Sequence, residues 1–322
     1  MIIGLIEHDR GKLNELSLQM LTLGRRLAQQ LSTPLGAILV GAEARPLAER
    51  LQAFGVSVVH LAHHEGLSSY APGAWAQSVS EVIKATNAQA VLAPGTERGN
   101  EVLAHVAARM NLPMAANCTE VQPGEPYQVT RTRWGGSLLE EARLAGAVKL
   151  LTVAPHAVAA EEAPSGEFSV KEFTPALTEK DLRVRVTARV ETKGDKISLA
   201  EARFVVGGGR GVGSAENFKS LEELAELLGG AVGCSRAVTS LGWRPHADQI
   251  GQTGTRIAPE LYIACGVSGA IQHMVGCKGA KRILAINTDP EASIVANADY
   301  AVIGDLNEVV PAIVAEVRKA KK

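Results

Sequence analysis

Short apolar runs alternate with amphipathic stretches in the first third of the chain. The apolar runs predict strands at 2–7, 35–41, 56–62 and 90–95. The stretches between them show helical periodicity and predict helices at 13–31, 43–54, 73–87 and 97–110. Because strands that alternate with helices form βαβ units, this pattern predicts a parallel sheet covered by helices on both faces.

The pattern changes after residue 126, where three strand-like runs follow one another without helices. They lie at 127–134, 137–146 and 148–155, and Gly135-Gly136 separates the first two. We expect an antiparallel extension of the sheet, with the glycine pair as a hairpin turn. Residues 156–200 are less regular. Their strictly alternating segment RVRVTARVE (183–191) predicts a surface strand that leads into an interdomain linker.

A second series of strands and helices begins near residue 202. Strands are predicted at 202–208, 231–235, 261–266, 282–287 and 300–305, and helices at 214–229, 236–241, 269–278 and 306–320. Their alternating order predicts another doubly wound sheet. We therefore expect an α/β protein with two doubly wound domains, 1–195 and 196–322. Both sheets should be mainly parallel, with the antiparallel extension in the N-terminal domain.

Composition and charge exclude several classes of function. The chain has 322 residues, 46% of them hydrophobic, which is enough to bury two cores. A net charge of -1 gives no overall attraction to nucleic acid or to an anionic membrane. No apolar run is long enough to span a bilayer, and no targeting segment precedes the first strand, so we expect a cytoplasmic protein.

The four cysteines give no sign of a metal centre. Cys118, Cys234, Cys265 and Cys277 form no CxxC pair, so neither a zinc site nor an iron–sulfur site is indicated. They stand in apolar or glycine-rich surroundings, which favours small buried side chains in a reducing compartment.

Glycines and hydrogen-bonding residues follow every strand of the second series. These strand ends are the glycine run at 207–213, Ser235-Arg236, the segment 266–269 with Gln272 and His273 behind it, Asn287-Thr288-Asp289 and Gly304-Asp305, joined by the loop 251–254. The carboxyl ends of parallel strands share one edge of a sheet, so the residues could share one large polar ligand. Each residue alone also has a structural interpretation, such as a tight turn, a helix cap or a surface cation.

The glycine run does not match the dinucleotide fingerprint, which needs glycines at i, i+2 and i+5. Counted from Gly207 the third position is Val212, and counted from Gly208 the second is Arg210. This argues against an NAD enzyme, as does the absence of an acidic residue beside Ser235. An adenine-nucleotide sensor in the N-terminal domain is disfavoured too, because EHDRGKLNE, without a glycine-rich loop, follows the first strand.

The segment LYIACGVSGAIQHMVGCKGAKRILAIN (261–287) resembles the signature of the alpha subunit of electron transfer flavoproteins. Further segments that resemble this family are GGRG…SAENF (208–218), SRA (235–237), GQTG (251–254), APELY (258–262) and NTDP (287–290). The resemblance is dense in the C-terminal half and extends over the whole chain in length and domain order. One departure is Thr288, where many members carry Lys, and it puts one cation near the cofactor in doubt.

The resemblance implies that the C-terminal domain binds FAD. Arg210, Ser268, Gly269, Asn287 and Asp305 would contact the pyrophosphate, ribose and adenine side, and Arg236, Gln252, Thr253, Gln272 and His273 would surround the flavin ring and the ribityl chain. The remaining members of the implied site are Ser235, Ile250, Gly251, Gly254, Ala270, Ile271 and Leu306. No catalytic group and no metal ligand is implied.

The resemblance also implies an electron carrier rather than an enzyme with its own substrate. Such a chain pairs with a beta subunit that holds AMP or a second FAD. It takes electrons from flavin dehydrogenases, such as the acyl-CoA dehydrogenases of fatty acid beta-oxidation, and passes them to a quinone oxidoreductase of the respiratory chain. The alternative is the flavin subunit of an electron-bifurcating complex. Neither implies nucleic-acid binding or direct membrane insertion.

Overall fold

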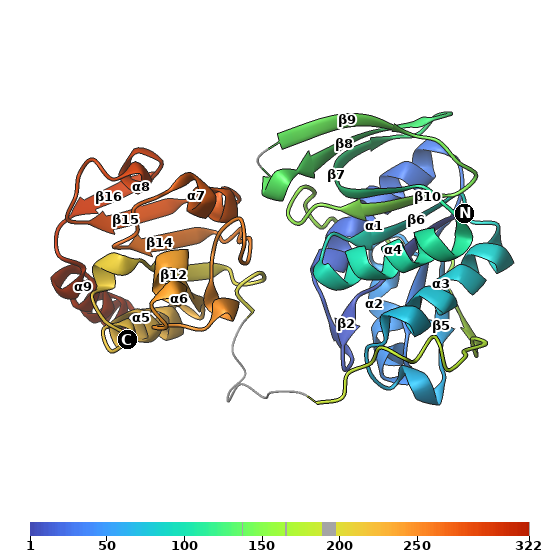
Figure 1. Cartoon of the computed structure of the whole chain (residues 1–322), viewed down its shortest axis with the longest axis horizontal. Coiled ribbons are helices and arrows are strands. Elements are labelled where there is room, and N and C mark those ends of the chain that lie inside the picture. The colour runs from blue at the N-terminus through green and yellow to red at the C-terminus, as the bar shows by residue number, and fades with distance from the viewer. Residues whose placement is uncertain (137, 165, 189–197, 322) are drawn as a thin grey trace. The chain divides into compact units, whose positions relative to one another are not determined.

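The chain folds into two compact units, Met1–Glu191 and Thr192–Lys322 (Figure 1). The computed structural model describes residues 1–136, 138–164, 166–188 and 198–321. The predicted domain boundary, between 195 and 196, lies outside the described residues. Each unit is a sheet with helices packed on it, and both sheets are mainly parallel. The predicted fold class, α/β with two doubly wound domains, is therefore confirmed.

The described part of the N-terminal unit contains a nine-stranded sheet in the order β11-β5-β4-β1-β6-β10-β7-β8-β9. Its strands are β1 Ile2–Leu5, β4 Leu35–Val40, β5 Val58–Ala62, β6 Ala90–Pro94, β7 Met114–Gln122, β8 Tyr127–Arg133, β9 Leu138–Leu144, β10 Lys149–Val153 and β11 Ser169–Phe173. β11 through β7 in this order are parallel, whereas β8 and β9 are antiparallel. β2 (His8–Asp9) and β3 (Lys12–Leu13) form a separate small ribbon.

The antiparallel extension is confirmed for β8 and β9, but the prediction that 148–155 belongs to it is wrong. β10 lies between β6 and β7 and is parallel to both. The extension starts instead from β7, a strand of mixed burial that the hydrophobic pattern does not reveal. The chain turns between β8 and β9 at 134–136, where Gly136 has a φ of 93°, and residue 137 lies outside the described residues.

The alternating segment 183–191 is not a strand over its described part, residues 183–188. Val186 donates a backbone hydrogen bond to the Tyr70 carbonyl, but no neighbouring strand pairs with the segment. Residues 189–191 lie outside the described residues. The edge of the sheet is formed instead by β11, which pairs with β5 and which the sequence pattern does not predict.

The helices of the N-terminal unit pack on both faces of its sheet. They are α1 Leu16–Gln30, α2 Ala48–Gln52, α3 Pro72–Thr86 and α4 Glu97–Met110. Because successive residues of a strand point to opposite faces, Ile2 packs with α1 and α2, whereas Ile3 packs with α3 and α4. Thr96 caps α4 by accepting a hydrogen bond from the Gly99 N–H, which fixes where that helix begins.

The C-terminal unit is a five-stranded parallel sheet in the order β13-β12-β14-β15-β16. Its strands are β12 Phe204–Gly208, β13 Ala231–Cys234, β14 Leu261–Cys265, β15 Ile283–Asn287 and β16 Tyr300–Ile303, and its helices are α5 Phe218–Leu228, α6 Arg236–Ser240, α7 Ile271–Cys277, α8 Ser293–Ala296 and α9 Leu306–Ala320. α5 and α9 pack on one face, against Val206 and Ile263. α7 and α8 pack on the other, against Tyr262 and Ala264.

Two helix predictions in this unit need correction. The helix predicted from Ser214 begins at Phe218, because Gly213 has a φ of 86° and the Asn217 side chain donates to the Val212 carbonyl at 2.8 Å. These contacts hold 213–217 in an irregular turn. The short helix α8 is not predicted, and it follows β15 directly behind the Asn287 loop.

All four cysteines are free and buried, as predicted. Burial raises the pKa of each thiol to about 12. None of the helices in the described residues combines the length and the apolar character needed to cross a membrane.

Candidate functional site

The strand order of the C-terminal unit creates a topological switch point between β12 and β14. From β12 the chain passes outward to β13, and then returns to the other side of β12 to form β14, β15 and β16 (Figure 1). The loops after β12 and β14 therefore leave the sheet in opposite directions. Open α/β sheets bind their ligands in the crevice that this divergence leaves at the carboxyl ends of the strands.

The floor of this crevice is bare backbone. The Gly209 N–H donates to the Cys265 carbonyl at 2.8 Å, and the Gly211 N–H donates to the Gly266 carbonyl at 3.1 Å. A Cβ on Gly209 would lie 2.1 Å from the Gly266 carbonyl oxygen, and one on Gly211 would lie 2.8 Å from the Gly266 Cα. The glycine run thus lets two strand-end loops pack main chain against main chain, without the dinucleotide fingerprint.

A groove of about 590 Å³ lies above this floor. Of the residues predicted from the sequence, it brings together Arg210, Ser235, Ser268 and Asn287. Gly211, Gly266 and Asp289, which the sequence analysis names only as strand-end residues, also line it, and the residues that sequence reasoning missed are Ala237, Glu291, Ala292 and Ser293. Glu291 directly follows the NTDP segment behind β15, so its place after a strand end was the signal that could have found it.

Charge changes sign across the carboxyl edge. Arg210 and Arg236 follow the neighbouring strands β12 and β13, and both are exposed. Asp289 and Glu291 follow β15 at the other side of the switch point, and Asp305 follows β16. Guanidinium groups bind phosphates, whereas carboxylates accept hydrogen bonds from hydroxyl groups. This order suits a ligand with an anionic centre and a sugar, such as a nucleotide.

Three serine and asparagine side chains in the groove differ in their availability. Ser235 is the N-cap residue of α6, but its side chain makes no capping hydrogen bond. Ser268 is exposed on the β14 loop. Asn287, in contrast, donates from Nδ2 to the Val267 carbonyl at 2.9 Å and accepts from the Asp289 N–H at 3.1 Å. Asn287 therefore ties the ends of β14 and β15 together and shapes the groove.

The loop 249–255 forms a second part of the site, next to the end of β13. Its Ile250 N–H donates to the Cys234 carbonyl at 2.8 Å, and its Gln252 N–H donates to the Gln272 carbonyl at 2.7 Å. A Cβ on Gly276 would lie 2.3 Å from the Gly251 nitrogen, so the loop lies directly on α7. The structure thereby brings the predicted residues 250–254 together with 272–273.

The side chains of this second part point in different directions. Thr253 is exposed on the loop, and Ala270, Ile271 and Gln272 are exposed at the start of α7. Ile250 is buried in the core. Gly254 is packed against the backbone, because a Cβ there would lie 2.2 Å from the Gln249 carbonyl oxygen. Thr253 and Gln272 are therefore exposed polar side chains that this loop and helix offer to a ligand, and Gln252 next to Thr253 is half-buried.

His273 is turned into the core rather than toward solvent. It is only 6% exposed, and its Nε2 lies 2.8 Å from the hydroxyl of the fully buried Tyr262. Burial lowers the pKa of His273 to about 4, which outweighs the opposite effect of the Ile250 backbone, and Nδ1 has no hydrogen-bond partner among the described residues. His273 is therefore neutral at pH 7. It adds no positive charge to this part of the site at that pH.

The remaining predicted residues lie at the opposite end of the edge. Asp305 is the N-cap of α9, where its carboxylate accepts from the Asn307 N–H at 2.8 Å. Leu306 is buried, and its Cδ2 would lie 2.9 Å from a Cβ on Gly266. Leu306 therefore packs against the β14 loop, and Gly269, with a φ of 79°, lets the loop turn toward Ile294 on the other face.

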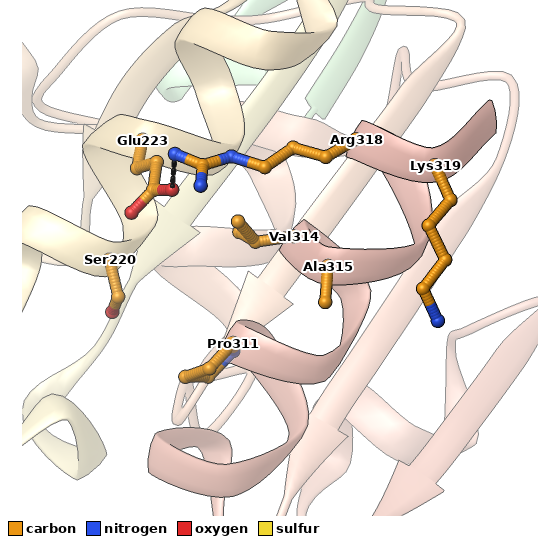
Figure 2. A pocket seen from close by; sticks show the side chains of 7 residues that line it. All are labelled: Ser220, Glu223, Pro311, Val314, Ala315, Arg318 and Lys319. Carbon is orange, nitrogen blue, oxygen red and sulfur yellow. Dashed lines mark ion pairs between the residues drawn. The ribbon is translucent and has the colours of Figure 1, made fainter. Parts of the chain in front are cut away.

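A second hollow of the C-terminal unit, about 430 Å³, lies away from the strand ends. Figure 2 shows that it runs between α5 and α9 and that Arg318 reaches across it to Glu223, with 2.6 Å between Nη2 and Oε1. Lys319, the other cation of the hollow, pairs with Glu316 at 2.7 Å, so the charged side chains there already have partners. The two hollows differ in this respect, because the groove at the carboxyl edge offers donors that have no partner among the residues that the structure describes.

Comparisons with known proteins agree with this location of the site. The chain matches the model of the electron transfer flavoprotein domain over residues 2–178 and that of the electron transfer flavoprotein FAD-binding domain over residues 198–278. The second match contains the switch point and the loop 249–255. Asn287, Asp305 and Leu306 lie beyond it.

Curated relatives match over nearly the whole chain. The electron transfer flavoprotein subunit alpha of Thermoanaerobacterium thermosaccharolyticum is 34% identical, over 98% of this chain and 97% of its own length. The protein of that name from Mycobacterium tuberculosis is 37% identical, over 100% and 99%. Protein FixB of Clostridium saccharobutylicum is 36% identical, over 97% and 95%. The chain therefore belongs to the family of electron transfer flavoprotein alpha subunits, and its C-terminal unit carries the FAD-binding domain of that family.

Proposed function

We propose that this chain is the alpha subunit of a heterodimeric electron transfer flavoprotein. In this role it carries electrons on FAD from flavin dehydrogenases, such as acyl-CoA dehydrogenases, to a quinone oxidoreductase of the respiratory chain. The observation that carries the proposal is the groove at the β12–β14 switch point, whose walls from β12, β13 and β14 lie within the part of the chain that matches the FAD-binding domain.

The groove has the donors that the anionic centre of FAD needs. Arg210 supplies an exposed guanidinium, and no ion pair occupies it within the described ranges of the chain. Ser235 and Ser268 supply hydroxyl groups that have no partner of their own among the described residues. We propose that these three residues hold the pyrophosphate, and that Asp289 and Glu291 accept hydrogen bonds from sugar hydroxyl groups.

We propose that the flavin ring lies at the other end, beside Arg236, Gln252, Thr253 and Gln272. A flavin accepts two electrons and can release them one at a time, so the protein's task there is to tune the ring and to control access to it. Arg236 would stabilise negative charge on the ring, because an opposite charge at contact distance lowers its energy. His273 is neutral and buried, and it supports the ring side by holding the start of α7 on Tyr262.

The partner is part of the proposal. The relatives named above as subunit alpha imply a second subunit in those proteins, and we propose a beta subunit with AMP for this chain. The bifurcating alternative differs in the nucleotide of that subunit, which would be a second FAD. Dehydrogenases and the quinone oxidoreductase would be transient partners.

Co-purification of the chain with a beta subunit of the same organism tests the proposal. After heat extraction, FAD and AMP are counted per pair of subunits. One FAD and one AMP support the proposed carrier, and two FAD molecules without AMP support the bifurcating alternative. A pure chain without flavin absorbance, both alone and with its partner, would reject both.

A further inference from the structure

Gln249 is a polar side chain in the core of the C-terminal unit. It is 2% exposed, and its amide lies between two threonines. Nε2 donates to the Thr253 hydroxyl at 2.9 Å, and Oε1 accepts from the Thr239 hydroxyl at 2.8 Å. A buried amide needs such partners, because an unpaired polar group in the core costs about 1–3 kcal/mol.

The backbone of Gln249 also closes the loop 249–255, which carries Thr253. Its carbonyl oxygen accepts from the Thr255 N–H at 2.7 Å, and Gly254 packs against the same oxygen. Gln249 is thus the buried first residue of the loop, and Thr253 is exposed near its middle. The hydrogen bond between the two side chains holds one side-chain rotamer of Thr253 in place.

The direction of this hydrogen bond decides what Thr253 can offer outward. A hydroxyl has one proton and accepts with its lone pairs. When Nε2 donates to the Thr253 oxygen, the Thr253 proton remains free for a ligand. If the amide turned over, Thr253 would donate inward to Oε1 and could only accept outside.

Thr239 allows both orientations of the amide. Its hydroxyl lies 2.8 Å from Gln249 Oε1 and 2.9 Å from the Arg236 carbonyl oxygen, and it can donate to only one of them. With the amide turned over, Thr239 would donate to the carbonyl and accept from Nε2. Gln249 therefore connects the start of α6, where Arg236 stands, with Thr253.

We propose that Gln249 is a positioning residue of the cofactor site, which holds the Thr253 hydroxyl and sets its hydrogen-bond role toward the flavin ring. The inference rests on the proposed function, in which Thr253 lies beside that ring. Gln249 itself has no access to the ligand, because it is buried beneath the loop. Its influence must pass through Thr253.

A double-mutant cycle on the full chain tests this coupling. The variants are Gln249→Met, which keeps the length of the side chain without its amide, Thr253→Val, and the two together. For each, the dissociation constant for FAD is measured by quenching of flavin fluorescence, the midpoint potential by anaerobic titration, and the free energy of unfolding by urea. The matched control is Ser240→Ala, an exposed hydroxyl next to Thr239.

Each single variant should weaken FAD binding about fivefold, the loss of one net hydrogen bond. The double variant should bind no more weakly than Thr253→Val, and Gln249→Met should shift the midpoint potential only when Thr253 is present. Ser240→Ala should leave both readouts unchanged. A purely structural role for Gln249 would instead lower the stability and give additive losses.

The outcomes separate this inference from the proposed function. If Thr253→Val changes neither FAD affinity nor potential, the ring-side site is wrong and the inference falls with it. If Thr253→Val weakens binding but Gln249→Met has no effect or an additive one, the inference alone is overturned. Should Gln249→Met fail to fold, the cycle of Thr239→Val with Thr253→Val decides by the same criterion.

Discussion

Both units have a switch point at the carboxyl edge of their sheet, but the residues that follow the strands there differ in character. In the N-terminal unit the switch point lies between β1 and β6, and Glu7 and Thr96 follow these strands. The Thr96 hydroxyl donates to the Glu7 carboxylate, and Asn14 Nδ2 donates to its other oxygen at 2.9 Å. A carboxylate of the chain therefore occupies the position next to the N-terminus of α4, where a phosphate would otherwise bind favourably.

Among the described residues, no carboxylate of the chain fills the C-terminal switch point in this way. Glycine backbone forms its floor, and the hydroxyl groups of Ser235 and Ser268 and the guanidinium of Arg210 have no partner in the described part of the chain. The difference teaches that the architecture supplies a crevice, whereas the residues after each strand decide whether the crevice binds a ligand.

The sharpest test of this comparison divides the chain. A fragment of residues 198–322 should bind FAD, and a fragment of residues 1–188 should bind none, because Glu7 repels an anionic ligand from its switch point. Reconstitution with FAD, gel filtration and flavin absorbance measure this. A yellow N-terminal fragment would remove the contrast between the two edges.

A single substitution should disrupt the floor of the C-terminal crevice. In Gly209→Ala the new methyl group would lie 2.1 Å from the Gly266 carbonyl oxygen, so the two loops must move apart. We expect a loss of stability on the order of 3 kcal/mol, together with the loss of FAD binding.

Gly304→Ala is the matched control at another strand end of the same sheet, because the nearest atom there, Val309 Cγ2, is 3.4 Å away. It should change the free energy of unfolding by less than about 0.5 kcal/mol. Equal losses in both variants, measured by urea unfolding, would contradict the role of the bare backbone floor.

Acid should weaken the C-terminal unit through His273. Its pKa is about 4 in the folded chain and about 6.5 when unfolded, so the unfolded chain binds more protons between these values. Stability is lost as the pH falls through this window, by on the order of 2 kcal/mol at pH 5. Replacement of His273 by Leu should remove this part of the pH dependence while FAD still binds.

Urea unfolding of the full chain at pH 7 and pH 5 gives the measurement, with Trp243 as the tryptophan of the C-terminal unit. The N-terminal unit has histidines of its own, and burial lowers the pKa of the buried His8 and of the half-buried His60 and His156. Only the difference between the wild type and His273→Leu is therefore informative. If the free energy of unfolding falls by the same amount between pH 7 and pH 5 in the wild type and in His273→Leu, His273 is not protonated on unfolding.

The smallest expected effect concerns the exposed cation at the ring end. Arg236→Ala should make FAD harder to reduce by roughly 40 mV, because a unit charge at contact distance in water contributes about 1 kcal/mol. Arg203→Ala is the control, since Arg203 is an exposed arginine at the amino end of β12. Equal midpoint potentials for Arg236→Ala and the wild type, with FAD bound, would exclude Arg236 from the ring environment.

Much of the fold could be predicted from the sequence because buried parallel strands are short apolar runs between amphipathic helices. The helices α4 and α9 have the predicted bounds. Which strands pair with one another was harder to predict. β10 reads as a neighbour of β9 along the chain, yet it lies between β6 and β7, and periodicity carries no information on that choice. β7 was missed because its Asn117 and Glu120 interrupt the apolar pattern.

The site was predictable where it depends on strand ends. Arg210, Ser235, Ser268 and Asn287 meet in one groove, as the rule for carboxyl edges requires. The orientation of single side chains was not predictable. His273 begins a helix at the site but turns inward to Tyr262, and Gln249 reaches Thr253 across a loop without regular spacing.

The four buried thiols allow chemical labelling to measure the local opening of each unit. A thiol with a pKa of about 12 is almost wholly protonated at pH 8, and its sulfur is out of reach of an alkylating reagent while the sheet is closed. Reaction must then wait for the local separation of strands or helices. Cys118 in β7 reports on the N-terminal unit, and Cys234 and Cys265, which end β13 and β14, report on the crevice. Their labelling rates, with and without FAD, would therefore measure how often each unit opens locally.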